Sequence, residues 1–376
     1  MTSADTQNPR LPGVEGGGTT RRGMHIKLAA TYLGAVVGAG FASGQEHLHF
    51  FGQFSPGGGI GVMLAGLLFV LFGVLLADLA ARYGTSSPGE LLGHVVGKAL
   101  APPVDVLLAT FMFCSVAVML AGSGALFREQ VGLASNVGVG LTAAVTMIAT
   151  RGGIDGLLYL NTLMSPVLLG APILTALLSL VWAWRGILRP PCSPGPDVAL
   201  ANSLIPAWPI ASVLYVSYNL LLVVGIFASM GDEFGDARCA RRGATLGGLA
   251  LAVFMVALHI TLTVHGDDMW QQEVPMLTAA SYFGPLLRAA YSTCLWFAMV
   301  TTAVTACFSL ARRLEGRLGI SHRALAVVVT VVAGLLAQYG FANLVSRLYP
   351  VFGYLGLPLV FGLALTSIKI RLTIIR

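Results

Sequence analysis

The sequence has 376 residues, of which 56% are hydrophobic and 10% are charged, and its mean hydropathy is +0.81. A soluble domain carries roughly 25% charged residues, so this composition predicts an integral membrane protein and excludes a disordered chain or a disulfide scaffold. The net charge of +6 does not indicate a nucleic-acid partner, because basic residues in a membrane protein chiefly set its orientation.

The N-terminal segment differs from the rest of the chain. Residues 1–23 are polar and rich in Gly, Thr and Arg, which predicts a disordered cytoplasmic tail. They lack the short apolar core and small-residue cleavage site of a signal peptide. The transmembrane domain is therefore predicted to cover residues 24–376.

Ten apolar runs follow this tail, each close to the roughly 20 residues that a membrane-spanning helix needs. The predicted spans are 25–51, 59–82, 103–127, 136–150, 157–184, 204–230, 243–264, 284–311, 323–341 and 345–368. With both termini in the cytoplasm, 17 of the 22 Lys and Arg residues fall on the cytoplasmic side and 5 fall outside. This bias satisfies the positive-inside rule. We therefore expect an all-α, multi-pass protein of the cytoplasmic membrane with about ten transmembrane helices.

Two acidic residues, Glu46 and Asp78, are predicted to lie within spans. Arg82 follows Asp78 by four residues, so this spacing predicts an ion pair along one helix face. Glu46 has no such local partner. Because a charged group inside a membrane is costly and often functional, Glu46 is a candidate proton carrier. The alternative is that its carboxyl group bonds neighbouring backbone or Tyr hydroxyl groups and never changes its protonation state.

The first span contains four glycines near its centre, Gly34, Gly38, Gly40 and Gly44. Their spacing fits close packing of helices. However, packing does not explain the polar residues that accompany the glycines, which are Ser43, Gln45 and Glu46. A break in the helix explains both features, since two half-helices present free N–H and carbonyl groups to a ligand. Unwound backbone is tolerated at membrane depth where it lines a cavity or a site.

The sixth span carries a similar irregularity. Its apolar run is interrupted by polar residues, which are Tyr215, Ser217, Tyr218 and Asn219. Five spans precede this one and five begin with it, so the two halves, 25–184 and 204–368, must enter the membrane with opposite orientations. This arithmetic predicts an inverted repeat with broken helices one and six and a substrate site between them.

The expected substrate follows from the polar groups at the two predicted breaks. Free N–H groups after the first break favour a carboxylate, and polar side chains of the sixth span are expected to hold an amino or hydroxyl group. The predicted substrate-binding residues are Gly38, Gly40, Phe41, Ala42, Ser43, Ser217, Tyr218 and Asn219. The predicted core contains no Arg or Lys, which favours a neutral or zwitterionic small solute. Amino acids fit this description best, and nucleobases and quaternary amines also fit it.

The segment from Gly38 to Glu46 (Gly-Ala-Gly-Phe-Ala-Ser-Gly-Gln-Glu) resembles the hallmark of the YkvI-type bacterial membrane proteins. The ten-span layout resembles the amino acid/polyamine/organocation superfamily, which has the leucine-transporter (LeuT) fold. This resemblance implies a 5+5 inverted repeat in the bacterial inner membrane.

The superfamily resemblance also implies an ion site. In its sodium-coupled members, carbonyl groups just before the break in helix one meet a carbonyl group and two hydroxyl groups of helix eight. The matching residues here are Gly34, Val37, Ala298, Thr301 and Thr302. A second sodium site is not expected, because Ala35 and Phe41 stand where some relatives have Asn. At most one Na⁺ is therefore expected, and proton coupling through Glu46 is the competing prediction.

Together these features predict a secondary active symporter that works by alternating access. No P-loop and no metalloprotease motif is present in the sequence, so we expect neither an enzyme nor a cofactor other than a coupling ion. The expected partners are a small-molecule substrate and the lipid bilayer, with no nucleic acid; the sequence does not predict an oligomeric state. The alternative is a non-transporting ligand sensor, since the membrane subunits of germinant receptors resemble the same superfamily.

Overall fold

The computed structural model describes residues 23–54, 57–83, 88–97, 99, 101–152, 155–185, 204–230 and 236–375. Within these ranges all regular structure is helical, and seven helices are long and apolar enough to cross a membrane. They are α4 (Gly57–Tyr83), α6 (Ala101–Val131), α8 (Asp155–Trp184), α10 (Trp208–Ser229), α11 (Ala237–His265), α13 (Pro285–Leu318) and α15 (Phe341–Ile375). Two shorter apolar helices are α7 (Ser135–Gly152) and α14 (His322–Ala337).

The first predicted span consists of four short pieces instead of one helix. They are α1 (Met24–Val36), α2 (Ala39–Ser43), α3 (Gln45–His47) and the π-helix η1 (Leu48–Gly52). The remaining short helices are α5 (Pro88–Val96), η3 (Gly266–Met269) and α12 (Pro275–Ser281). The prediction of a multi-pass helical membrane protein is confirmed. The count of ten spans and the inverted repeat stay predictions. Of the predicted tail, 1–23, residues 1–22 lie outside the described residues.

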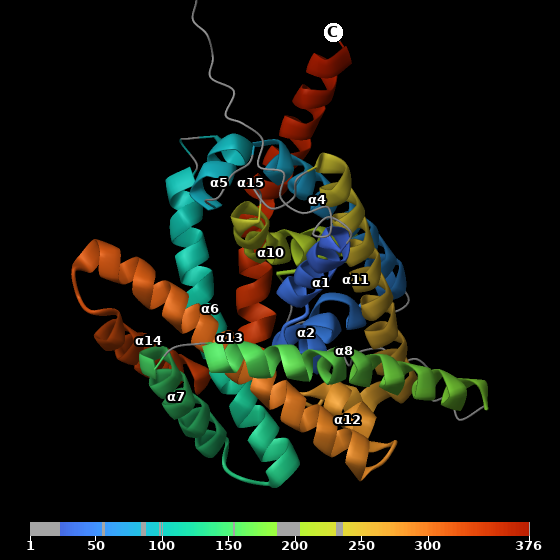
Figure 1. The fold of residues 1–376 in the computed structure, drawn as a ribbon. Coiled ribbons are helices and arrows are strands. Elements are labelled where there is room, and N and C mark those ends of the chain that lie inside the picture. Colours follow the sequence, from blue (N-terminus) through green and yellow to red (C-terminus); the bar gives the residue numbers. More distant parts are fainter. Residues whose placement is uncertain are drawn as a thin grey trace, which may run out of the picture.

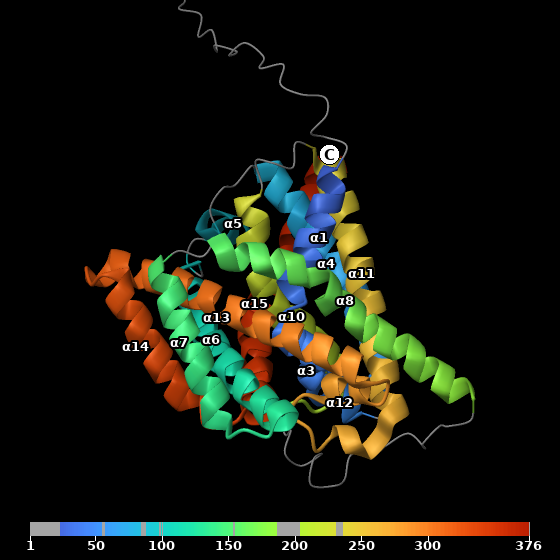
Figure 2. The same ribbon diagram turned by 60° about the horizontal axis from the view of Figure 1, so that its bottom comes forward.

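The helices form two packed groups that meet at α15 (Figures 1 and 2). In one group α11 packs against α1 and α4, and α10 packs against α4 and α15. In the other group α6 packs against α7, α13 and α14. The helix α15 also contacts α6, and α8 packs across α11 and α13. The short helices α2 and α3 of the first span are buried between these helices, whereas α1 keeps one exposed face.

Two glycines of α11 allow α1 to approach closely. A Cβ atom at Gly243 would lie 2.8 Å from the His25 carbonyl oxygen, and one at Gly247 would lie 2.8 Å from Cδ1 of Tyr32. Tyr32 is buried, and its hydroxyl group donates to the Phe69 carbonyl group of α4 at 2.8 Å. The helix α1 is thus held on one face by both α4 and α11.

We expect the substitution Gly247→Leu to lower the free energy of unfolding by about 1–3 kcal/mol, the usual cost of overpacking a core. The matched control is Gly170→Leu on α8, where a Cβ atom would meet no heavy atom within 4 Å. Thermal unfolding of the purified protein in detergent measures both effects. An equal fall in the unfolding temperature for the two variants would contradict the close approach of α1 and α11.

Ion pairs join the helices at one end of the bundle. The Asp78 carboxylate accepts hydrogen bonds from Arg82 at 2.6 Å and from Arg241 of α11 at 2.8 Å, which confirms the predicted pair and adds a second arginine. The Asp105 carboxylate of α6 accepts from Arg313 of α13 at 2.6 Å. The three arginines are among the 17 basic residues that the predicted topology places on the cytoplasmic side. Which end of the bundle faces the cytoplasm stays a prediction.

Candidate functional site

The predicted break in the first span is confirmed. The helix α1 ends at Val36, and Gly38 has an extended backbone with φ −88° and ψ −176°. The Gly38 N–H group donates to the Val36 carbonyl group at 2.9 Å, so the i to i−4 ladder of α1 stops here. Its last carbonyl groups thereby lose their regular helical partners.

The N–H groups after the break belong to α2, which begins at Ala39 and has no side-chain cap. The first ladder bond of α2 runs from the Ala42 N–H group to the Gly38 carbonyl group at 3.0 Å. The N–H groups of residues 39–41 come before Ala42 in the chain and therefore make no bond in this ladder. The predicted substrate-binding residue Ala42 is not among them, because its N–H group makes that first ladder bond.

A second interruption follows at Gly44. Its φ of +82° lies in the left-handed region, which Gly adopts without steric cost. The hydroxyl group of Ser43 donates to the Gly40 carbonyl group at 2.6 Å and accepts from the Gln45 N–H group at 3.2 Å. The hydroxyl group of Ser43, a predicted substrate ligand, therefore makes both of these hydrogen bonds within the turn.

Glu46 lies directly after this turn and folds back over α2. Its side chain is buried, and its Oε2 atom accepts a hydrogen bond of 2.5 Å from the Tyr218 hydroxyl group of α10. Its Oε1 atom occupies the space that a Cβ atom at Gly40 would need. The Tyr349 hydroxyl group of α15 lies 3.5 Å from the same position. The structure thus brings Gly40, Glu46 and Tyr218 together, and it adds Tyr349, which the sequence analysis missed.

Aromatic rings surround this carboxyl group. The ring of Tyr218 lies 5.0 Å from that of Tyr349 and 5.7 Å from that of Phe50, and Phe111 of α6 lies 6.2 Å from Tyr349. Within the part of the chain that the structure describes, Lys and Arg side chains form their ion pairs elsewhere, and none pairs with Glu46. The carboxyl group consequently lies in an uncharged, aromatic environment.

Phe41 and Ala42 lie in the same short helix, where their contacts are structural. The Phe41 ring packs 6.0 Å from that of Tyr215 and 5.4 Å from that of Phe254. The Ala42 carbonyl group accepts a hydrogen bond of 2.5 Å from the Tyr291 hydroxyl group of α13. These contacts fix α2 between the two groups of helices.

The predicted break in the sixth span is wrong, because α10 runs without interruption from Trp208 to Ser229. Two of its polar side chains have hydrogen-bond partners that leave the ladder intact. The Asn219 side chain donates to the Tyr215 carbonyl group one turn earlier at 2.8 Å, while Tyr218 bonds Glu46. Ser217 is buried next to Gly356 of α15, and its hydroxyl group has no hydrogen-bond partner among the described residues. Of the three predicted ligands, Tyr218 is the one that bonds the first span.

The five predicted ion ligands belong to α1, to the link that follows it and to α13. Val37 is buried in the non-helical link, and Thr301 is buried on α13 with its hydroxyl group donating to the Ala298 carbonyl group at 3.1 Å. Thr302 is half-buried. Among the described residues no group of three or more His, Cys, Asp or Glu side chains is arranged to hold a metal ion. The sodium site stays a prediction.

The face of α1 opposite its packed side is open. Leu28, Tyr32 and Val36 are buried, whereas Gly34 is exposed. A Cβ atom at Gly34 or Gly38 would meet no heavy atom within 4 Å. This open face runs along α1 to the break.

A pair of histidines lies beside this site. The Nε2 atom of His47, which is buried, lies 3.2 Å from Nδ1 of His259 on α11. Gln45 and His49 form a second contact, with 2.9 Å between their side-chain nitrogens. The contact between His47 and His259 joins α3 to α11, and the sequence did not reveal it because the two histidines are 212 residues apart.

Two proteins of Bacillus subtilis (strain 168) resemble this chain over nearly their full length. The uncharacterized membrane protein YkvI is 24% identical over 345 residues, which cover 90% of this chain and 95% of YkvI. The uncharacterized protein YyaD is 29% identical over 351 residues, covering 93% of this chain and 98% of YyaD. No family model matches the chain. These homologues confirm the resemblance to the YkvI-type membrane proteins.

Solved structures show the same fold at low sequence identity. MhsT in complex with L-phenylalanine aligns with a TM-score of 0.61 and 17% identity, covering 89% of this chain and 87% of MhsT. The inward-facing conformation of Mhp1 aligns with a TM-score of 0.55 and 16% identity, covering 88% and 73%. A Na⁺-coupled sialic acid symporter aligns with a TM-score of 0.51 and 14% identity, covering 93% and 87%. The chain therefore has a LeuT-like fold.

Proposed function

We propose that this protein is a secondary active symporter that moves a small neutral or zwitterionic solute, such as an amino acid, with H⁺ or Na⁺. The observation that carries the proposal is the broken first span, in which Gly40 faces the Glu46 carboxyl group and the Tyr218 and Tyr349 hydroxyl groups. Unwound backbone inside a membrane bundle indicates a binding site.

The chemistry around Gly40 supports a zwitterionic substrate. The N–H groups of residues 39–41 are suited to a carboxylate, and the Glu46 carboxylate and the neighbouring aromatic rings are suited to an ammonium group. A carboxylate buried without a cation is costly. A bound proton or the amino group of a substrate removes this cost, so Glu46 is the residue that we assign to proton coupling.

The fold and the open face of α1 support alternating access. The MhsT structure holds L-phenylalanine, and another structural neighbour is a Na⁺-coupled sialic acid symporter. In the present protein the open face of α1 ends at the break. A solute bound at Gly40 would lie at the end of this face.

Transport by purified protein in proteoliposomes tests the proposal. We expect uptake of at least one radiolabelled amino acid when an inward H⁺ or Na⁺ gradient is imposed, and loss of uptake when the gradient is collapsed. Binding of a solute without any flux would contradict transport and favour the ligand sensor.

The variant Thr301→Val/Thr302→Val distinguishes the two ions. If Na⁺ couples transport, removal of both hydroxyl oxygens is expected to raise the Na⁺ concentration for half-maximal uptake by tenfold or more. The matched control is Ser292→Ala/Thr293→Val, which removes two hydroxyl groups that bond the Ala289 carbonyl group near the start of the same helix. An unchanged Na⁺ response in the first variant would eliminate the predicted sodium site and leave Glu46 as the coupling group.

A further inference from the structure

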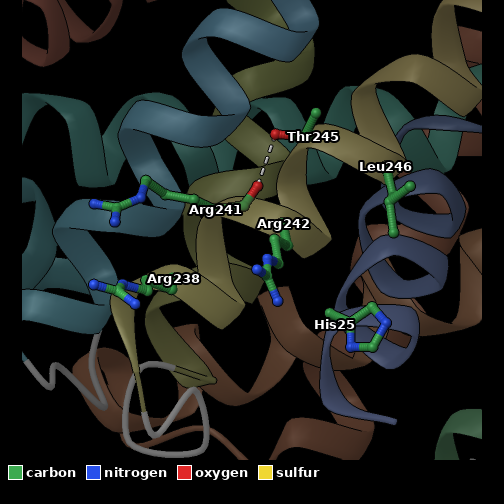
Figure 3. A pocket seen from close by; sticks show the side chains of 6 residues that line it. All are labelled: His25, Arg238, Arg241, Arg242, Thr245 and Leu246. Atoms are coloured by element: carbon green, nitrogen blue, oxygen red, sulfur yellow. Dashed lines mark hydrogen bonds between the residues drawn. The ribbon is translucent and has the colours of Figure 1, made fainter. Parts of the chain in front are cut away.

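A pocket of about 700 Å³ lies between the N-terminal ends of α1 and α11 (Figure 3). Its lining residues are His25, Arg238, Arg241, Arg242, Thr245 and Leu246. Figure 3 shows Arg242 and Leu246 projecting from α11 toward the end of α1 that carries His25. The pocket is remote from the Gly40 site, because the length of α1 separates His25 from the break.

The three arginines of this pocket differ in their partners. Arg241 is fixed by its hydrogen bond to the Asp78 carboxylate at 2.8 Å, and its carbonyl group accepts from the Thr245 hydroxyl group at 2.8 Å. Arg238 and Arg242 are exposed, and neither forms an ion pair with any residue in the described part of the chain. Among the described residues, these two guanidinium groups therefore have no carboxylate partner and are suited to an anion. The N-terminal end of α11 does not add to this attraction, because the Asp236 carboxylate already caps it by accepting from the Arg238 N–H group at 3.0 Å.

An apolar stripe continues from these arginines along the same helix face. Residues spaced three or four apart lie above one another on a helix, so Arg242 stands at the head of a row of exposed side chains. The members of this row are Leu246, Leu249, Val253 and Val256. Val253, near the middle of α11, is 63% exposed. Exposed aliphatic side chains along a membrane-spanning helix face the acyl chains of lipids.

We propose that this pocket binds the phosphate headgroup of an anionic phospholipid, with the acyl chains lying along the stripe from Leu246 to Val256. The arginines bind the phosphate group. The apolar stripe beside them favours an amphipathic lipid over a free anion as the ligand. The predicted orientation places this lipid in the cytoplasmic leaflet. The inference is independent of the transported solute.

Native mass spectrometry of the detergent-purified full chain tests this site, with phosphatidylglycerol and phosphatidylcholine of the same acyl chains added in equal amounts. We expect wild-type protein to retain phosphatidylglycerol preferentially, and Arg238→Gln/Arg242→Gln to lose affinity for it by roughly tenfold or more. The matched control is Arg312→Gln/Arg323→Gln, which removes two exposed charges from α13 and α14. This control is expected to keep the preference. Thermal unfolding without lipid checks that each variant is folded.

Three results would overturn the proposal. The first is equal retention of both lipids by wild-type protein. The second is an equal loss of phosphatidylglycerol in the control, which would indicate general surface charge. The third is competition by inorganic phosphate at millimolar concentration that removes the bound lipid completely, which would indicate a site for a free anion.

Discussion

Replacing Gly40 with Ala is expected to abolish substrate binding while the protein remains folded. The added Cβ atom would collide with the Glu46 carboxyl group and contact the Tyr349 hydroxyl group. Glu46 must then move away from α2, and its hydrogen bond to Tyr218 must lengthen or break. We expect the apparent affinity for substrate to fall by a hundredfold or more, measured as ligand-induced thermal stabilisation or as uptake.

The matched control for this variant is Gly225→Ala in α10. A Cβ atom at Gly225 would meet no heavy atom within 4 Å, and Ala is favoured over Gly inside a helix by about 0.5–1 kcal/mol. This control is expected to bind substrate normally and to be at least as stable as the wild type. Normal binding by Gly40→Ala would show that the substrate site lies elsewhere.

Replacing Glu46 with Gln is expected to eliminate transport driven by a pH gradient. The amide has nearly the size of the carboxyl group and can still accept the hydrogen bond from Tyr218, but it cannot carry a proton. If H⁺ is the coupling ion, uptake under a pH gradient should fall to the level of empty liposomes. Exchange of substrate across the membrane without a gradient should be retained, because it needs no net movement of protons.

Glu90→Gln on α5 provides the matched control, since this side chain is exposed and α5 packs chiefly against α6, α10 and α15. It is expected to transport normally at every pH. A pH gradient that drives Glu46→Gln as strongly as it drives the wild type would assign the hydrogen bond between Glu46 and Tyr218 a purely structural role.

The first span shows what the sequence can predict. Glycines at Gly34, Gly38 and Gly40 weaken a helix, and the polar residues that follow need partners, so the break was visible from composition. The left-handed turn at Gly44 could not be placed, because each nearby glycine is able to adopt a positive φ. That turn is what directs the Glu46 side chain back toward Gly40.

The sixth span shows why the same reasoning fails elsewhere. Polar residues in a helix also lie where their side chains bond back to the preceding turn, as Asn219 does to Tyr215, or to a neighbouring helix, as Tyr218 does to Glu46. Sequence alone does not distinguish these cases from a break. In this protein the hydrogen bond between Tyr218 of α10 and Glu46 of α3 satisfies a polar residue without any break in the helix.

The residues that the sequence analysis missed are aromatic side chains in apolar runs. Tyr349 and Tyr291 have the same appearance in the sequence as the other core aromatic residues. Their hydroxyl groups gain importance from contacts with Gly40 and with the Ala42 carbonyl group, each more than 200 residues away along the chain. Only the packing of α13 and α15 against the first span reveals them.

The central claim is that the broken first span binds a small solute together with a coupling ion. Its most direct test is the thermal unfolding of wild-type protein and Gly40→Ala against a panel of amino acids, in Na⁺ and in choline, at two pH values. A ligand raises the unfolding temperature only by binding the native state more tightly than the unfolded state. We expect at least one amino acid to stabilise the wild type in a manner that depends on Na⁺ or pH, and to leave Gly40→Ala unchanged. Equal stabilisation of both proteins, indifferent to Na⁺ and to pH, would contradict the account.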